Sequence, residues 1–291
     1  MINTILFIYV IILAASFLLE RVLDLLNVRH TVLELPEELA GIYEDDEYRK
    51  SQLYKKENTI FSLYSSTFSL AIMLAAILSG LFGILDQFLA SKVESYYLLV
   101  VLFFGILIFA SDILSIPFAL WDTFRIEEKY GFNKTTPRTF VLDKLKGWLL
   151  GAILGGGILI LINWIYNETG KYFWVIAWGV ITLFSVLMNM FYSNLIVPLF
   201  NKQTPLEEGE LRSEIEKFAG KVGYKLRNIY VIDGSKRSTK ANAYFSGLGP
   251  KKRIVLYDTL INDLETDEIM AVLAHEIGHY KKKHTLTGLI L

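Results

Sequence analysis

The 291-residue sequence contains no cysteine, so disulfide bonds, thiolate zinc ligands and thiol-based catalysis are excluded for this chain. Histidine is also scarce. The chain has only four histidines, and three of them lie between residues 275 and 284. The formal net charge is only −1, and no basic patch with interleaved aromatic residues is present. We therefore expect no nucleic-acid partner.

Hydrophobic residues make up 53 % of the chain, and five long stretches carry almost no charge. Each stretch reaches or nearly reaches the length that a helix needs to cross a bilayer. The first stretch could be a signal peptide, but no Lys or Arg precedes it and Glu20-Arg21 follow directly, so we expect an uncleaved helix. The sequence therefore predicts an integral multi-pass membrane protein whose residues 1–200 form a polytopic, mainly α bundle. Its five spans are residues 2–19, 59–85, 95–121, 148–166 and 172–200.

The distribution of Lys and Arg predicts the orientation of these spans. Residues 20–58 carry six, 86–94 one, 122–147 six and 167–171 one, and the remaining fifteen follow residue 200. Under the positive-inside rule, the N-terminus faces outward and the residues after 200 lie on the cytosolic side. Within the first cytosolic loop, we interpret the charged run at 45–50 as a solvated spacer rather than a short helix.

The pattern of residues 201–291 predicts a small α+β domain. A helix is expected from Thr204-Pro205 to about Ala219, and another begins at Thr266, with Asp267 and Glu268 in its first turn. Three short strands are expected between them, at residues 228–232, 241–245 and 253–257, with a turn at 247–250. The last helix continues through Lys281–Lys283 into an apolar stretch at 285–291, which we interpret as the start of a sixth span that is cut short.

This last helix carries the H-E-x-x-H sequence His275-Glu276-Ile277-Gly278-His279. Positions i and i+4 lie one above the other on a helix, so His275 and His279 present two imidazoles to one point. Zinc fits this arrangement, with Glu276 as the general base for hydrolysis. A chance match on an amphipathic helix is the alternative. His284 is turned roughly 140° away from His279, so we expect it at the membrane interface and find no convincing third ligand.

Together with this motif, the chain resembles the integral-membrane zinc proteases of the CAAX prenyl protease 1 (Ste24-type) family. The resemblance covers essentially the whole sequence. Four blocks in this order carry it, which are Ile126–Thr135, Pro198–Asn201, Asp233–Ser238 with Asn242–Phe245, and Ile254–Leu260 with Val272–His279.

The resemblance implies one Zn²⁺ per chain, with His275 and His279 as ligands and Glu276 activating water. It also implies a ring of seven membrane helices around a chamber, capped by the protease domain. The family's third ligand is a glutamate well downstream of the motif. We therefore expect this glutamate beyond Leu291, the chain to be an N-terminal part, and the 291-residue piece itself to lack activity.

The resemblance further implies that Asn242 and Ala243 bind substrate, on an edge strand that pairs with an extended peptide. From the residues alone, we would favour Asn242 as a turn-forming residue at a strand end. The implied substrate is a prenylated C-terminus from which the aaX tripeptide is removed. Peptide or protein substrates and membrane lipids are thus the expected partners.

Two other functions remain open at this point. A related zinc protease without lipid preference could degrade damaged membrane proteins, and a catalytically silent scaffold or lipid-binding chamber could share this architecture. The expected location is the endoplasmic reticulum membrane or a bacterial inner membrane, with the active site on the cytosolic side.

Overall fold

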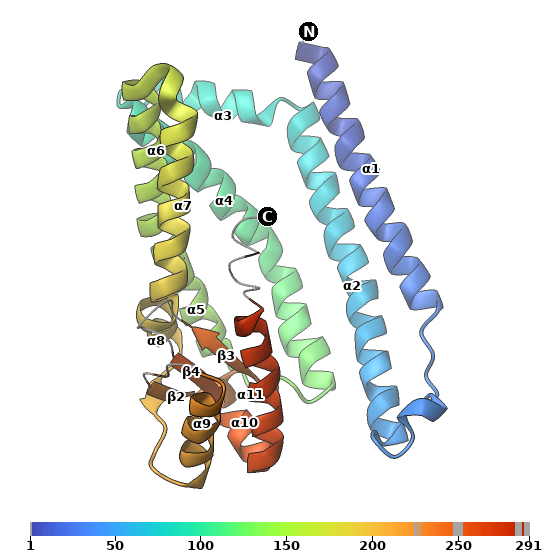
Figure 1. Ribbon diagram of the computed structural model, residues 1–291. Helices are drawn as coiled ribbons and strands as arrows, with labels where there is room; N and C mark the ends of the chain where they lie inside the picture. The colour runs from blue at the N-terminus through green and yellow to red at the C-terminus, as the bar shows by residue number, and fades with distance from the viewer. Residues whose placement is uncertain (1, 224–225, 227, 247–252, 283–286, 288–291) are drawn as a thin grey trace. The chain divides into compact units, whose positions relative to one another are not determined.

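The computed structural model describes residues 2–223, 226, 228–246, 253–282 and 287 (Figure 1). The chain divides into two compact units, Met1–Gly131 and Phe132–Leu291, which are treated separately below. This division follows packing, since the helices between Phe132 and residue 200 belong to the same unit as the small sheet. The domain boundary at residue 200 stays a prediction. The structure is mainly helical with a small α+β region, as predicted.

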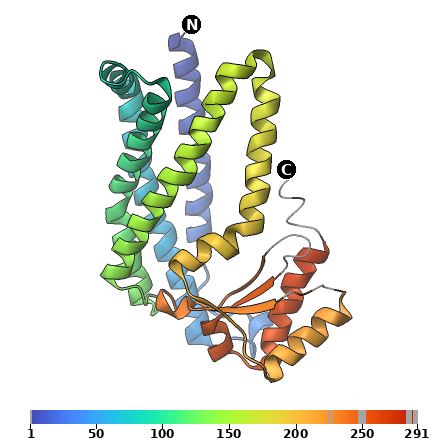
Figure 2. The same ribbon diagram turned by 90° about the vertical axis from the view of Figure 1, so that its left-hand side faces the viewer.

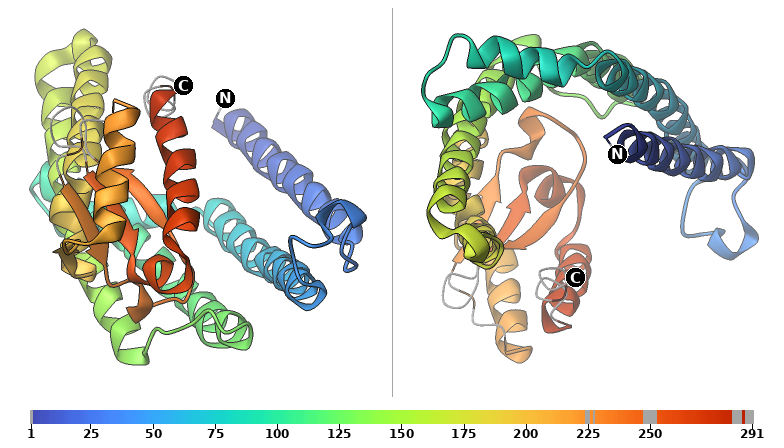
Figure 3. Two further views of the ribbon diagram at one scale, coloured as in Figure 1. Left: turned by 60° about the horizontal axis from the view of Figure 1, so that its bottom comes forward. Right: turned by 90° about the horizontal axis from the view of Figure 1, so that it is seen from above.

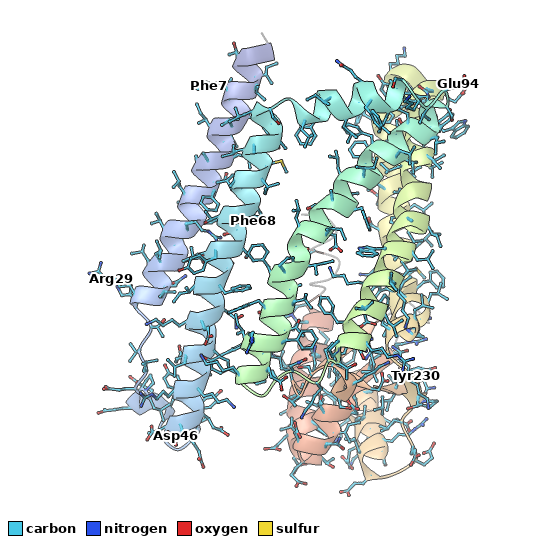
Figure 4. All side chains as sticks on the ribbon, turned by 180° about the vertical axis from the view of Figure 1, so that it is seen from behind. Phe7, Arg29, Asp46, Phe68, Glu94 and Tyr230 are labelled. Atoms are coloured by element: carbon cyan, nitrogen blue, oxygen red, sulfur yellow. The ribbon has the colours of Figure 1, made fainter. Side chains whose placement is uncertain are left out.

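The first unit consists of long apolar helices. They are α1 (Ile2–Arg29), α2 (Asp45–Leu78), the short α3 (Leu81–Ala90) and α4 (Tyr96–Trp121), with a 3₁₀ turn at Glu37–Leu39. Helices α1 and α2 run side by side (Figure 1). Apolar side chains project along both of them, including the labelled Phe7 and Phe68, which are 65 % and 38 % exposed (Figure 4). A helix that is apolar all round and yet unburied is suited to lipid.

The N-terminal part of α2 corrects the sequence interpretation. Residues 45–50, expected to be a spacer, form the first turns of α2. Asp45, Asp46 and Glu47 occupy the first turn, where carboxylates favour the positive end of the helix dipole. The apolar stretch that begins at residue 59 therefore covers only the later part of a 34-residue helix.

In the second unit, α5 (Pro137–Leu150) continues through a π-helical turn (Gly151–Gly155) into α6 (Gly156–Thr169). Helix α7 (Phe173–Phe191) then returns beside α6, and a second π-helical turn (Tyr192–Ile196) leads into α8 (Val197–Phe200) (Figure 2). Thr136 caps α5, since its hydroxyl accepts from the Thr139 N–H at 3.1 Å. Over the described residues, four helical stretches are long and apolar enough to cross a membrane, and the last, Pro137–Phe200, includes both arms of this hairpin. The count of five crossings stays a prediction.

The sheet of the second unit has the strand order β1-β2-β4-β3. Strands β2 and β4 are parallel, whereas β1 and β3 run antiparallel to their neighbours. Helices α9 (Glu210–Lys221) and α11 (Thr266–Lys281) lie on the sheet (Figure 3), and α10 (Asp258–Asp263) joins β4 to α11. One core unites these elements, with Ile215 of α9 and Leu273 of α11 packed on Ile229, Ile254 and Leu256. The strands are β1 (Gln203–Pro205), β2 (Asn228–Ile232), β3 (Ala243–Ser246) and β4 (Arg253–Tyr257).

Local predictions in this region had mixed success. Strands β2 and β4 coincide with the predicted ranges, and β3 begins two residues later than expected. The helix expected from Thr204 begins at Glu210, because residues 203–205 pair with β2 instead. The predicted turn at 247–250 lies outside the described residues, as does the apolar stretch at 285–291 apart from residue 287.

Candidate metal centre

Helix α11 holds the H-E-x-x-H motif at a fixed position on the sheet. The Glu268 carboxylate accepts from the backbone N–H of Glu265 at 2.9 Å, which satisfies a donor at the start of the helix. Ile269, Leu273 and Ile277 recur at every fourth position and are at most 3 % exposed. Because this stripe faces the core, the helix can neither rotate nor slide without exposing it.

The two histidines converge away from that buried stripe. The Nε2 atoms of His275 and His279 lie 3.0 Å apart, with ring centroids at 4.7 Å and planes inclined by 71°. Two imidazole nitrogens on one zinc ion, each bound at about 2.0–2.1 Å, must lie roughly 3–3.5 Å apart. The pair therefore fits such an ion. Glu276, the next residue along, is partly exposed, and both histidines are open to solvent.

A third metal ligand does not accompany the two histidines in the part of the chain that the structure describes. Among the residues that the structure describes, no group of three or more His, Asp or Glu side chains could hold a metal ion. His284 lies outside those residues, so its expected place at the membrane interface stays a prediction. Lys281 and Lys282, at the end of the described helix, are exposed.

Asn242 and Ala243 lie at the start of β3, the strand at one edge of the sheet. Ala243 is 5 % exposed and belongs to the same core cluster as Leu273, so β3 packs against α11, the helix that carries the two histidines. The Asn242 carbonyl accepts from the Tyr257 N–H at 3.0 Å, within the β3–β4 pairing. Because successive residues of a strand direct their backbone groups to opposite sides, the Ala243 N–H is directed away from β4.

That outward N–H already has a partner. It donates to the side-chain oxygen of the preceding residue, Asn242, at 2.8 Å. The Asn242 side chain thus bonds to the N–H that a peptide at the open edge of β3 would use. Its role in substrate binding stays a prediction.

A polar cluster behind β3 was not anticipated from the sequence. The Tyr244 hydroxyl lies 3.2 Å from the hydroxyl of Ser193, which is fully buried in the π-helical turn after α7. Gln203 donates to that serine oxygen at 3.4 Å. Burial raises the pKa of the Tyr244 hydroxyl, so it stays protonated. The end of a membrane helix is thereby fastened to the edge strand by residues distant in sequence.

A bidentate ion pair provides a second link between the sheet region and the membrane helices. Arg237 donates through Nε and Nη2 to the two oxygens of Asp143 on α5, both at 2.8 Å, and through Nη2 to the Phe200 carbonyl at 2.9 Å. The Lys134 N–H also donates to the Arg237 carbonyl at 3.0 Å. The loop after β2 is thus tied to the segment that leads into α5. The family resemblance drew attention to this loop, but nothing in the sequence identified Asp143 as its partner.

Comparison with known proteins decides the family. The model described as "CAAX prenyl protease N-terminal, five membrane helices" matches residues 24–202, and that of "Peptidase family M48" matches residues 205–291. The chain belongs to the M48 family of CAAX prenyl proteases. This confirms the family predicted from the four sequence blocks.

Members of the M48 family with curated names are similar along most of the chain. The CAAX prenyl protease 1 homolog of Arabidopsis thaliana is 38 % identical over 286 residues, covering 94 % of this chain and 67 % of that protein. CAAX prenyl protease 1 of Saccharomyces cerevisiae is 38 % identical over 268 residues, covering 88 % and 59 %.

A solved structure agrees with the fold as well. The crystal structure of S. mikatae Ste24p matches with a TM-score of 0.91 at 36 % identity, over 98 % of this chain and 69 % of that one. The chain spans 57 % to 69 % of the length of the curated M48 relatives.

Proposed function

We propose that the full-length protein is a zinc metalloendopeptidase whose site contains His275, Glu276 and His279. The observation that carries the proposal is the 3.0 Å approach of the two histidine Nε2 atoms on a helix held rigidly by its buried stripe. Membership of the M48 family supports it. Hydrolytic zinc sites usually have a third protein ligand, and the downstream glutamate expected for it stays a prediction.

In this mechanism, His275 and His279 would hold the metal through their Nε2 atoms. A zinc ion bound there would polarise the scissile carbonyl and make a water molecule more acidic. Glu276 orients the attacking water, takes its proton and delivers that proton to the leaving amine. The carboxylate is adjacent in sequence to one ligand, so the helix itself fixes its distance from the metal.

Substrate binding is proposed at the open edge of β3. An extended peptide would add a strand there, accepting from the Ala243 N–H in place of the Asn242 side-chain oxygen. The small side chain of Ala243 lies in the core rather than at the edge, so it does not obstruct an approaching backbone.

The proposed substrate is a prenylated C-terminus that loses its last three residues. The Arabidopsis and yeast relatives are both named as CAAX prenyl proteases, which supports this choice. We place the site on the cytosolic side on the basis of the loop charges, in the endoplasmic reticulum or a bacterial inner membrane. Membrane helices enclosing a chamber belong to the same proposal.

The test compares a farnesylated CAAX peptide with its unprenylated twin, using the full-length protein in detergent and mass spectrometry of the products. Removal of the carboxylate in Glu276→Gln is expected to lower kcat by at least about 100-fold, because general-base catalysis contributes 10²–10⁴-fold. Zinc content should stay the same. Glu265→Gln serves as the matched control, since it makes the same change just before the same helix.

Loss of three residues from the farnesylated peptide alone, abolished by Glu276→Gln and unaffected by Glu265→Gln, would support the proposal. Equal cleavage of both peptides would favour the quality-control protease. Substantial turnover by Glu276→Gln would refute the assigned base, and a full-length protein without zinc would favour the silent scaffold.

A further inference from the structure

The Tyr244 hydroxyl takes no part in the proposed chemistry, yet it joins the edge strand β3 to the end of a membrane helix. We propose that Tyr244 is a positioning residue for the substrate. Its hydroxyl, 3.2 Å from that of Ser193, holds β3 where an extended peptide can pair with it. The inference rests on the proposed function, because β3 receives a peptide only if the protein is the proposed peptidase.

Tyr244 points away from the helices that cover the sheet. Its neighbours along β3, Ala243 and Phe245, both pack in the core beneath α9 and α11. Since successive residues of a strand point to opposite faces, the Tyr244 side chain is directed to the other face. There its ring meets Tyr257 of β4 edge-on, with the centroids 6.4 Å apart. The ring is thus held by an inner strand, and its hydroxyl reaches Ser193, which lies outside the sheet.

Ser193 is placed so that it depends on this contact. It lies in the π-helical turn Tyr192–Ile196 after α7 and is 0 % exposed, so its hydroxyl is shielded from water. Side-chain contacts come from Tyr244 on β3 at 3.2 Å and from Gln203 on β1 at 3.4 Å. These two strands are the opposite edges of the described sheet. Because a buried hydroxyl without partners is costly, the end of α7 and the edge strands are held together.

The contact lies next to the backbone group that a peptide would use. Tyr244 directly follows Ala243, whose N–H is directed to the open edge. Strand β3 has only four residues and, among the described strands, pairs with β4 alone. Such an edge can separate locally from its sheet. A bond from its second residue to α7 orders the strand before the peptide arrives, which lowers the entropic cost of binding. The hydroxyl should therefore affect KM rather than kcat.

The test is steady-state kinetics of the full-length protein with the farnesylated CAAX peptide. Tyr244→Phe removes only the hydroxyl and is expected to raise KM about fivefold, the factor for one net hydrogen bond, with kcat and zinc content unchanged. Ser193→Ala breaks the same contact from the helix side and should raise KM by a similar factor. The double variant should be no worse than either single one, because both changes remove one shared contact.

Tyr257→Phe is the matched control, since it makes the same substitution in the neighbouring ring. The Tyr257 hydroxyl bonds to no residue that the structure describes. Amide hydrogen exchange without substrate, followed by mass spectrometry, gives a readout that does not depend on proteolysis. Exchange in residues 243–246 should be faster in Tyr244→Phe than in the unmodified protein and unchanged in Tyr257→Phe.

A higher KM in Tyr244→Phe and Ser193→Ala, with the control unchanged, would support the positioning role. An unchanged KM would overturn it, and so would a loss of kcat at constant KM, which indicates only a smaller folded fraction. Equal exchange of β3 in Tyr244→Phe and the unmodified protein would also overturn it. Failure of the unmodified protein to cleave the peptide is a separate result, since it would refute the proposed function itself and this inference with it.

Discussion

His275 and His279 come together through helix periodicity alone, and for that reason the sequence could place them. Their Nε2 atoms, 3.0 Å apart, need only one turn of α11 to meet. Asn242 is different, because its sequence context allowed a turn residue or a substrate-binding residue. Its side-chain oxygen accepts from the Ala243 N–H, and its substrate-binding role stays a prediction that depends on the edge position of β3.

Replacing His279 by Ala is expected to lower bound zinc in the full-length protein by at least about tenfold, because a ligand set of three cannot easily lose one member. Metal content would be measured by elemental analysis after dialysis against a weak chelator. His30→Ala is the control, since that imidazole bonds to the Leu26 carbonyl at 2.7 Å in the first unit. Equal zinc in the two variants would contradict the assignment of His279.

At the scale of elements, the edge position of β3 links the fold to the proposed substrate. The order β1-β2-β4-β3 leaves β3 paired with β4 on one side only, among the described strands. The buried contact between Tyr244 and Ser193 holds this edge against the end of α7. A strand that is held in place by a side-chain contact and has one unpaired edge is suited to adding another strand.

Asn242→Ala should therefore raise KM for the prenylated peptide several-fold while leaving zinc content unchanged, because the Asn242 side chain, once displaced from the Ala243 N–H, would bond to the backbone of the bound peptide. Steady-state kinetics at several peptide concentrations would separate KM from kcat. Asn228→Ala is a close control, since Asn228 makes the same contact with the Ile229 N–H, at 2.9 Å, at the start of an inner strand. Similar kinetics in both variants would argue against substrate pairing at β3.

For the molecule as a whole, one polar link between the membrane helices and the sheet of the second unit carries a testable consequence. The Arg237–Asp143 pair connects residues 94 positions apart, and both side chains are about three-quarters buried, at 23 % and 25 % exposed. Removing one member would leave the other charge without its partner in a partly desolvated place.

Arg237→Met is therefore expected to destabilise the protein by about 2 kcal/mol, below the range for a fully buried pair because water still reaches these groups. Thermal unfolding in detergent, followed by tryptophan fluorescence, would show a lower Tm. The comparison is Lys217→Met, which removes an exposed pair with Glu214 on α9 and should change the Tm little. If the two variants unfold alike, the Arg237 pair does not stabilise the unit.

Features that depend on short-range patterns could be predicted from the residues alone. Long apolar runs indicated membrane helices, and i to i+4 spacing predicted the paired histidines. Short runs bounded by turn residues predicted β2 and β4. Each of these signals lies within a few neighbouring residues. The strand order, the Asp143 partner of Arg237 and the Ser193 contact of Tyr244 emerged only from the tertiary structure. These arise when distant segments pack together, and a single sequence does not record which distant segments pair. Even the start of α9 was decided that way, since pairing of Gln203–Pro205 with β2 overrode the local helix signal at Thr204.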